Sequence, residues 1–309
     1  MATEAVTAPP AAAPRRGITD RARSERRTAW LLCAPAVIVM LAVTGYPIVY
    51  AFILSLQRYD LRFPSQKKFI GFANYGDVLS AHTWWTDVLN TVIITGFSVA
   101  LELVLGMCVA LVMHRAIFGR GLVRTTVLNP YGIVTVVAAF AWLYAFSPSS
   151  GFVPHLLGLS SDPFASRSGS FIVIILTEVW KTTPFMALLL LAGLALVPDE
   201  LLEAAKVDGA SAWQRFWRIT VPLMKPAILV ALLFRTLDAF RVFDTVFIQT
   251  QGANKTETVS ILGYHELITR LNIGEGSAIS VLIFAMVILI AVVFVKGFGA
   301  STAQQRGDV

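Results

Sequence analysis

The sequence predicts an all-α integral membrane protein whose helices cross the bilayer six times. Of its 309 residues, 56% are hydrophobic and only 14% are charged, whereas about 25% of residues are charged in an average soluble protein. The mean hydropathy is +0.69. A helix needs ~20 apolar residues to cross the hydrocarbon core, and six segments meet this need: 29–56, 89–113, 123–147, 171–197, 226–249 and 278–298.

The two ends of the chain are expected outside the bilayer. Residues 1–28 are rich in alanine, proline and arginine without apolar periodicity, which predicts a disordered tail near anionic lipid. The first apolar run is longer than the ~7–15 residue core of a signal peptide, so we expect a retained span. The transmembrane domain then covers residues 29–298, and residues 299–309 form a short C-terminal tail.

The distribution of basic residues predicts the orientation. If both termini are inside, the inner segments hold fifteen Lys or Arg residues and the outer loops seven. By the positive-inside rule, both termini are cytoplasmic, as in a multi-pass protein of the inner membrane. Basic residues gather at the ends of apolar runs and form no basic face interleaved with aromatics, so we expect no nucleic-acid partner.

Small residues and prolines interrupt several predicted spans. Gly96 with Ala100, and Gly106 with Ala110, would let helix backbones approach closely. Prolines and a glycine within other spans predict kinks in a closely packed bundle; these residues are Pro35, Gly45, Pro47, Pro130 and Pro184. Cys33 and Cys108 lie inside apolar runs and are expected to pack as small hydrophobes.

The polar stretch Glu203–Pro222, EAAKVDGASAWQRFWRITVP, separates the fourth and fifth predicted spans. Asp199 can cap a helix over residues 200–208, and Gly209 supplies a left-handed stop. Ser211 and Gln214 match a capping box that starts a second helix, and Pro222 limits its far end. We expect two short cytoplasmic helices joined at a glycine elbow, the second with one aromatic face formed by Trp213, Phe216, Trp217 and Thr220.

This stretch resembles the cytoplasmic motif of permeases from bacterial ABC importers. The matching residues are Glu203, Ala204, Ala205, Gly209, Ile219 and Pro222, with Val221 where the family usually has leucine. FIGFANY at 69–75 and Trp180 are similar to elements of the carbohydrate, maltose-type branch. The segment TQGANKTET keeps Gly252 but has Ala253 and Asn254 where that branch has Gly-Pro. The resemblance extends over nearly all of residues 29–298 and implies the type I ABC importer permease fold.

The resemblance also implies partners. In this family the first helix of the loop is a coupling helix that docks on a separate ATPase, which would place Glu203, Ala204, Ala205, Asp208 and Gly209 at that contact. The chain has no G-x-x-x-x-G-K-[ST] motif, so ATP and Mg²⁺ are expected on the ATPase rather than on this chain. The implied assembly adds a second homologous permease, two ATPase subunits and an extracytoplasmic sugar-binding protein.

Ionisable residues inside the predicted spans are costly and usually face the bundle interior. They are Glu102, Glu178, Lys181, Arg235, Asp238, Arg241 and Asp244. One interpretation is mutual neutralisation at a spacing of three, Glu178 with Lys181 and Asp238 with Arg241. The other is a hydrated sugar path, and resemblance to the maltose importer implies that it is formed by Lys181, Thr182, Phe185, Phe234, Asp238 and Arg241, with Trp180 or Phe185 facing a sugar ring.

We therefore expect a transport subunit that passes a sugar and is not an enzyme. Likeness over the whole chain to trehalose-importing members of the family favours a disaccharide, with trehalose first. A permease for glycerol phosphate is an alternative, because intramembrane Lys181, Arg235 and Arg241 could bind anionic oxygens. A membrane-embedded transferase is another, but the four histidines (His82, His114, His155 and His265) are scattered without catalytic or metal-ligand spacing.

Overall fold

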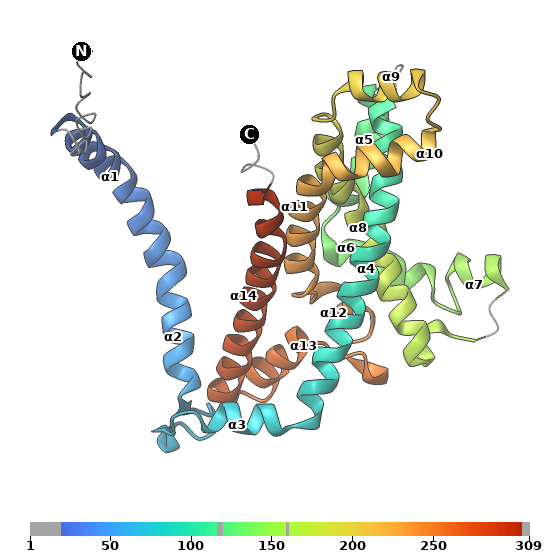
Figure 1. Cartoon of the computed structure of the whole chain (residues 1–309). Helices are drawn as coiled ribbons and strands as arrows, with labels where there is room; N and C mark the ends of the chain where they lie inside the picture. Colours follow the sequence, from blue (N-terminus) through green and yellow to red (C-terminus); the bar gives the residue numbers. More distant parts are fainter. Residues whose placement is uncertain (1–19, 116–119, 159–160, 305–309) are drawn as a thin grey trace, which may run out of the picture. The chain divides into compact units, whose positions relative to one another are not determined.

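The computed structural model describes residues 20–115, 120–158 and 161–304, and these are almost entirely helical (Figure 1). The chain divides into two compact units, Met1–Tyr50 and Ala51–Val309. The predicted all-α membrane protein is confirmed. Five described helices are long and apolar enough to span a membrane, or six if a bent pair counts as one span.

The first span is a continuous helix formed by α1 (Asp20–Met40), a π turn η1 (Leu41–Gly45) and α2 (Tyr46–Ser55). Its backbone is helical from Asp20, so residues 20–28 are not the disordered tail that we expected, and residues 1–19 lie outside the described part. The π turn ends two residues before Pro47. Because Pro47 has no N–H for the carbonyl of Val43, the helix widens there instead of breaking.

Three more predicted spans are present as single helices. They are α4 (His82–Arg115), α8 (Arg167–Leu194) and α14 (Ile273–Gln304). The fifth span differs from its prediction of 226–249. A continuous helix runs through α10 (Ala212–Arg215), the π turn η4 (Phe216–Thr220) and α11 (Val221–Ala239), stops at Ala239, and is followed after a break by α12 (Asp244–Gln249).

The third predicted span, 123–147, is not one helix. It consists of α5 (Arg120–Gly132) and α6 (Thr135–Ala145), and the helices over Thr125–Gly132 and Thr135–Ala145 are bent by 94°. Pro130 and Gly132, the two poorest helix formers, lie immediately before the bend. Averaged hydropathy does not detect this break, because the two helices taken together are apolar enough to count as one span.

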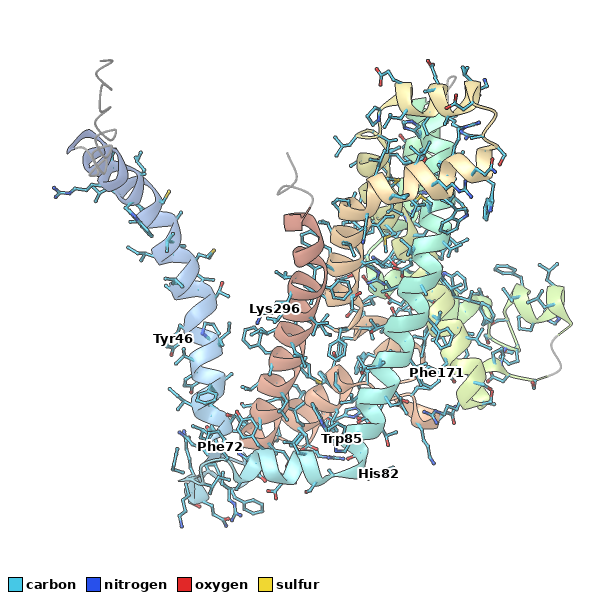
Figure 2. The ribbon with its side chains drawn as sticks, in the orientation of Figure 1. Tyr46, Phe72, His82, Trp85, Phe171 and Lys296 are labelled. Atoms are coloured by element: carbon cyan, nitrogen blue, oxygen red, sulfur yellow. The ribbon has the colours of Figure 1, made fainter. Side chains whose placement is uncertain are left out.

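Shorter elements connect the spans. A two-stranded antiparallel hairpin joins β1 (Gln57–Arg58) to β2 (Lys68–Phe69). Asn74 of the FIGFANY motif then donates to the carbonyls of Ser55 and Gln57, at 2.7 and 2.9 Å. The remaining short elements are η2 (Pro64–Gln66), α3 (Ala73–Ser80), α7 (Phe152–Leu157), η3 (Pro163–Ala165), η5 (Ala253–Lys255), α13 (Val259–Tyr264) and the π turn η6 (His265–Thr269). Trp85 near the start of α4 closes the α3–α4 corner, with its indole N–H 2.9 Å from the carbonyl of Leu79 (Figure 2).

The main apolar core lies between α4, α8 and α11. Its buried residues are Val99, Met107, Ala110, Met186, Leu190, Leu194, Met224, Ala231 and Ala239. A Cβ added at Gly106 would lie 2.8 Å from Cγ of Met186, so the predicted close approach at Gly106 and Ala110 is confirmed. A Cβ at Gly96 would meet no atom within 4 Å, and the Gly96–Ala100 pair makes no such approach within the described residues.

The TQGANKTET segment forms a tight loop between α12 and α13. Gln251, Gly252, Asn254 and Lys255 all have positive φ, between 52° and 83°. Asn90 of α4 stabilises the loop by donating to the carbonyls of Lys255 and Glu257, at 3.0 and 2.7 Å. The loop that replaces the usual Gly-Pro pair is therefore held by α4.

Candidate functional site

The polar elbow expected after α8 is present. Helix α9 (Asp199–Val207) ends where Asp208 N–H bonds the carbonyl of Ala204 at 3.0 Å. Gly209 follows with a φ of +81° and with open space around its Cβ position, so glycine is needed there for its backbone conformation rather than for room. No residue of α9 is buried, and Glu203, Ala204, Asp208 and Gly209 are exposed while Ala205 is half-buried.

The second helix, which follows the elbow, begins as predicted. The Ser211 hydroxyl accepts from the N–H of Gln214 at 3.2 Å, and the Gln214 side chain accepts from the N–H of Ser211 at 2.8 Å. Two other expectations are wrong. Asp199 lies in the first turn of α9 and makes no capping bond, because Pro198 occupies the cap position. Pro222 does not end the helix, because the π turn η4 absorbs its missing N–H.

A polar cavity of about 410 Å³ lies among α5, α6, α8 and the end of α11. It lies beside the α11–α12 break, where the backbone leaves helical geometry between Ala239 and Asp244. Irregular backbone at membrane depth is tolerated only where protein buries it or where it lines a water-filled space. The lining residues are Tyr131, Thr135, Glu178, Lys181, Thr182, Arg235, Asp238, Arg241, Val242, Phe243, Asp244 and Thr245.

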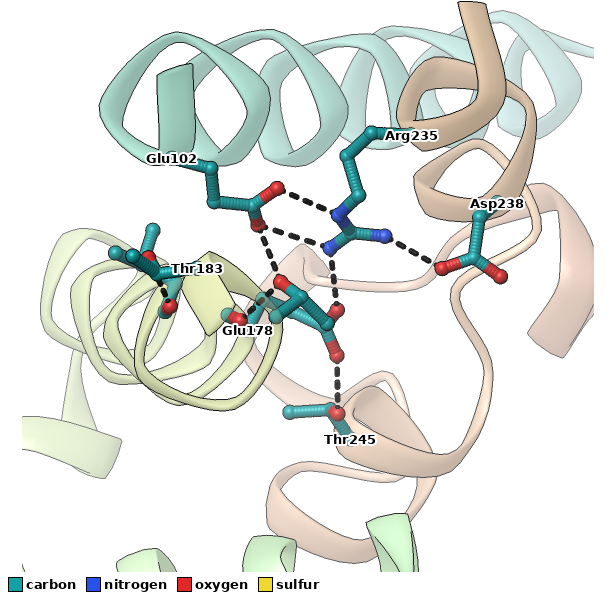
Figure 3. A network of polar contacts seen from close by, with 8 residues as sticks. Glu102, Glu178, Thr183, Arg235, Asp238 and Thr245 are labelled. Carbon is teal, nitrogen blue, oxygen red and sulfur yellow. Dashed lines mark hydrogen bonds and ion pairs between the residues drawn. The ribbon is translucent and has the colours of Figure 1, made fainter. Parts of the chain in front are cut away.

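Arg235 is the centre of a buried ion-pair network beside this cavity (Figure 3). Its guanidinium contacts Glu102 of α4 at 2.5 Å, Glu178 of α8 at 3.0 Å and Asp238 of α11 at 2.8 Å. The Arg235 side chain is 1% exposed and that of Asp238 is 65% exposed. One cation therefore links three helices and holds a carboxylate at the cavity.

Two threonines complete the network. Thr182 donates to Oε1 of Glu102 at 2.6 Å, and Thr245 of α12 donates to Oε1 of Glu178 at 2.5 Å. The predicted pairs Glu178 with Lys181 and Asp238 with Arg241 do not form ion pairs in the described part of the chain. Glu178 and Asp238 both contact Arg235 instead: α8 packs against α11 and brings Glu178 to Arg235, while Asp238 lies three residues after Arg235 on α11 itself.

The cavity brings together four of the six residues predicted for the path: Lys181, Thr182, Asp238 and Arg241. Phe185 does not line it, but its ring stacks on Tyr131 with centroids 5.4 Å apart. Phe234 is 56% exposed and lies outside the lining. Trp180 also lies outside it, with its ring 6.0 Å from that of Trp142.

The cavity residues Tyr131 and Thr135 of the bent third span and Thr245 of α12 were not predicted from the sequence. Tyr131 and Thr135 flank the bend, and the Lys181 ammonium lies 5.5 Å from the Tyr131 ring centroid. The Pro130–Gly132 pair was the available signal, since a break in a span exposes side chains and backbone to an interior space. Among the described residues, no group of three or more His, Cys, Asp or Glu side chains could hold a metal ion.

Relatives of known name match most of the chain. The trehalose transport system permease protein SugA of Mycobacterium tuberculosis is 56% identical over 283 residues, which cover 92% of each chain. The trehalose/maltose transport system permease protein MalF of Thermococcus litoralis is 39% identical, covering 88% of this chain and 94% of its own. The sn-glycerol-3-phosphate permease UgpA of Agrobacterium fabrum is 32% identical, covering 84% and 90%.

Solved structures share the fold. A chain of a bacterial ABC transporter that imports the acidic polysaccharide alginate has a TM-score of 0.75 at 22% identity, covering 94% of this chain and 100% of its own. The alginate transporter in complex with a periplasmic protein bound to alginate pentasaccharide gives a TM-score of 0.77, also at 22% identity, covering 90% and 97%.

The family model described as binding-protein-dependent transport system inner membrane component matches residues 69–302. This range includes the elbow and every residue lining the polar cavity. The chain therefore belongs to this family: it is a transport subunit rather than an enzyme, with the helical permease fold of type I ABC importers.

Proposed function

We propose that this permease passes a disaccharide, with trehalose favoured, through the polar cavity at the α11–α12 break. The observation that carries the proposal is the balance of positive and negative side chains in the cavity lining. Besides the buried pair Arg235 and Glu178, cationic donors (Lys181, Arg241) and acidic acceptors (Asp238, Asp244) line the cavity in equal numbers. Each sugar hydroxyl both donates and accepts a hydrogen bond, so a neutral polyol can use both kinds.

The aromatic pair beside the cavity supports a sugar. Tyr131 lines the cavity and stacks on Phe185, which gives the cavity wall an apolar ring face. The names of two relatives support trehalose, since SugA is named for trehalose transport and the Thermococcus protein for trehalose/maltose transport. Glycerol phosphate is the second candidate, supported by Lys181 and Arg241 in the lining and by the likeness to UgpA.

The elbow supports coupling to a separate ATPase. We place Glu203, Ala204, Ala205, Asp208 and Gly209 at the contact, because this stretch is exposed and hydrogen-bonded into a fixed turn. ATP and Mg²⁺ would be bound by two ATPase subunits on the cytoplasmic side, where both termini also lie. A second homologous permease and an extracytoplasmic sugar-binding protein would complete the importer.

Substrate identity is tested with the assembly reconstituted in proteoliposomes together with its binding protein. We expect trehalose to stimulate ATP hydrolysis and to accumulate inside, with weaker responses to maltose and none to glycerol phosphate. Asp238→Asn and Arg241→Gln should raise the trehalose concentration for half-maximal transport about tenfold each, since each removes a charged hydrogen-bond partner. Ile172→Ala, at an exposed position of α8, is the control. Stimulation by glycerol phosphate alone would replace trehalose with the second candidate.

The coupling role is tested by pull-down of wild type and Gly209→Asp with the ATPase subunit. Aspartate at a φ of +81° strains the elbow and adds a charge to the contact. We expect loss of the co-purified ATPase, or retention of it with sugar-independent hydrolysis. Gly76→Asp in α3, where an added Cβ also meets no atom within 4 Å, is the matched control. Wild-type coupling in Gly209→Asp would contradict the docking role.

A further inference from the structure

An apolar groove of about 720 Å³ separates α4 from the elbow and the helix that follows it. Its α4 wall extends from Leu103 to Arg115, and its opposite wall includes Leu202 of α9, Phe216 of η4 and Ile228 of α11. Neither the elbow contact nor the sugar path uses this groove. The thirteen residues of the α4 wall measure about 20 Å along the helix. The groove is therefore long enough to cross one hydrocarbon leaflet of roughly 15 Å.

The charged residues of the groove lie at one end and are arginines. Arg115 ends α4, and Arg215 lies on α10 across from it. Within the described part of the chain, no acidic residue lines the groove. The rest of the lining is almost wholly apolar. The groove is therefore apolar along most of its length and basic at the end formed by Arg115 and Arg215, which we call the basic mouth.

Two tryptophans place the mouth at a membrane interface. Trp213 and Trp217 line the groove and are 70% and 51% exposed. Tryptophan is enriched at the level of lipid headgroups, where its ring is buried and its N–H stays wet. The basic mouth is at the same level, beside the turn that joins α9 to α10.

We propose that this groove binds an anionic phospholipid, with an acyl chain along Leu103–Leu111 and the phosphate at Arg115 and Arg215. Basic pockets between membrane helices are known to bind anionic headgroups.

The groove also has a place in the working cycle. Leu202 belongs to α9 and Leu194 to α8, so a bound chain would pack between the coupling helix and the bundle. The lipid would then contact the elbow on its membrane side while the ATPase binds its cytoplasmic side. Anionic lipid is expected to raise sugar-stimulated ATP hydrolysis through this support.

The test measures lipid retained by the purified importer after equilibration in mixed micelles of phosphatidylcholine and phosphatidylglycerol. Wild type should retain phosphatidylglycerol selectively. Arg115→Gln should lower that retention about fivefold, the effect of removing one basic group at about 1 kcal/mol. Lys296→Gln removes a charge from the last part of α14 (Figure 2), outside the groove, and should have no effect.

A second variant addresses the acyl chain without changing any charge. Cys108 lines the groove and is exposed, so in a Cys33→Ser background it can be labelled with a bulky maleimide after assembly. Labelling should displace the bound phosphatidylglycerol. Equal retention of both lipids, unchanged retention after Arg115→Gln and labelling, or protection of Cys108 in the delipidated assembly would overturn the proposal. The last result would show that a polypeptide segment covers the groove.

Discussion

Arg235 is the residue on which the bundle interior depends most. Its side chain is almost fully buried, and its partners come from α4, α8 and its own helix. A buried charge is tolerable only when it is paired and hydrogen-bonded. Glu102 is itself inaccessible to solvent, so Arg235 and Glu102 each depend on the other to compensate a buried charge.

Arg235→Met is expected to destabilise the protein by about 3–5 kcal/mol, because Glu102 and Glu178 would remain buried without their cation. The measurement is the fraction still folded in detergent after stepwise heating. Arg241→Met removes the same charge from an exposed position and should leave the melting temperature unchanged. Adding Glu102→Leu to Arg235→Met should recover part of the lost stability. Equal melting of the two single variants would show that the network contributes little.

At this scale the sequence identifies which residues matter but not their partners. All four charged members of the network lie within predicted spans, and the cost of such residues in lipid makes each a candidate. The pairings predicted from spacing on one helix were wrong: Asp238 pairs with Arg235, three residues before it, rather than with Arg241, and Arg235 also pairs with Glu102, 133 positions away. Only the packing of α4 against α11 brings them together.

Helix boundaries could be predicted where hydrogen bonds between residues close in sequence determine them. Gly209 and the Ser211–Gln214 box fix the elbow through bonds within a few residues, so the sequence was sufficient there. The fifth span ended ten residues early, at Ala239, and the third was bent. In the fifth span the break falls among the charged residues Asp238, Arg241 and Asp244, and the tertiary packing around the cavity determines where the helix stops.

Helix packing gives a matched pair of substitutions within α4. Gly106→Leu should destabilise the bundle by about 1–3 kcal/mol, because its side chain would enter the close contact with Met186. Gly96→Leu makes the same change where nothing lies within 4 Å and should leave the stability of the isolated chain unaltered. Both are measured by detergent thermal unfolding of the purified chain. A larger loss for Gly96→Leu would mean that the α4–α8 contact is not the tight one.

For the molecule as a whole, one continuous helix joins the two candidate sites. It begins at Ala212, directly after the elbow, and ends at Ala239, next to Asp238 in the polar cavity. Its 28 residues correspond to about 42 Å. A rigid helix of this length would carry a displacement of the elbow to the cavity wall. The resemblance that identified the elbow gave no hint of this continuity, because Pro222 predicted a stop.

If this helix transmits the movement, a hinge in its middle should separate hydrolysis from transport. Val230→Pro removes one helical hydrogen bond and kinks the helix, at a side chain that is 47% exposed. We expect the reconstituted importer to bind its ATPase and hydrolyse ATP, while sugar stimulation and uptake fall at least tenfold. Val230→Ala, which keeps the helix intact, controls for the lost side chain. Full sugar uptake by Val230→Pro would mean that α8 or α4, rather than α11, links the elbow to the cavity.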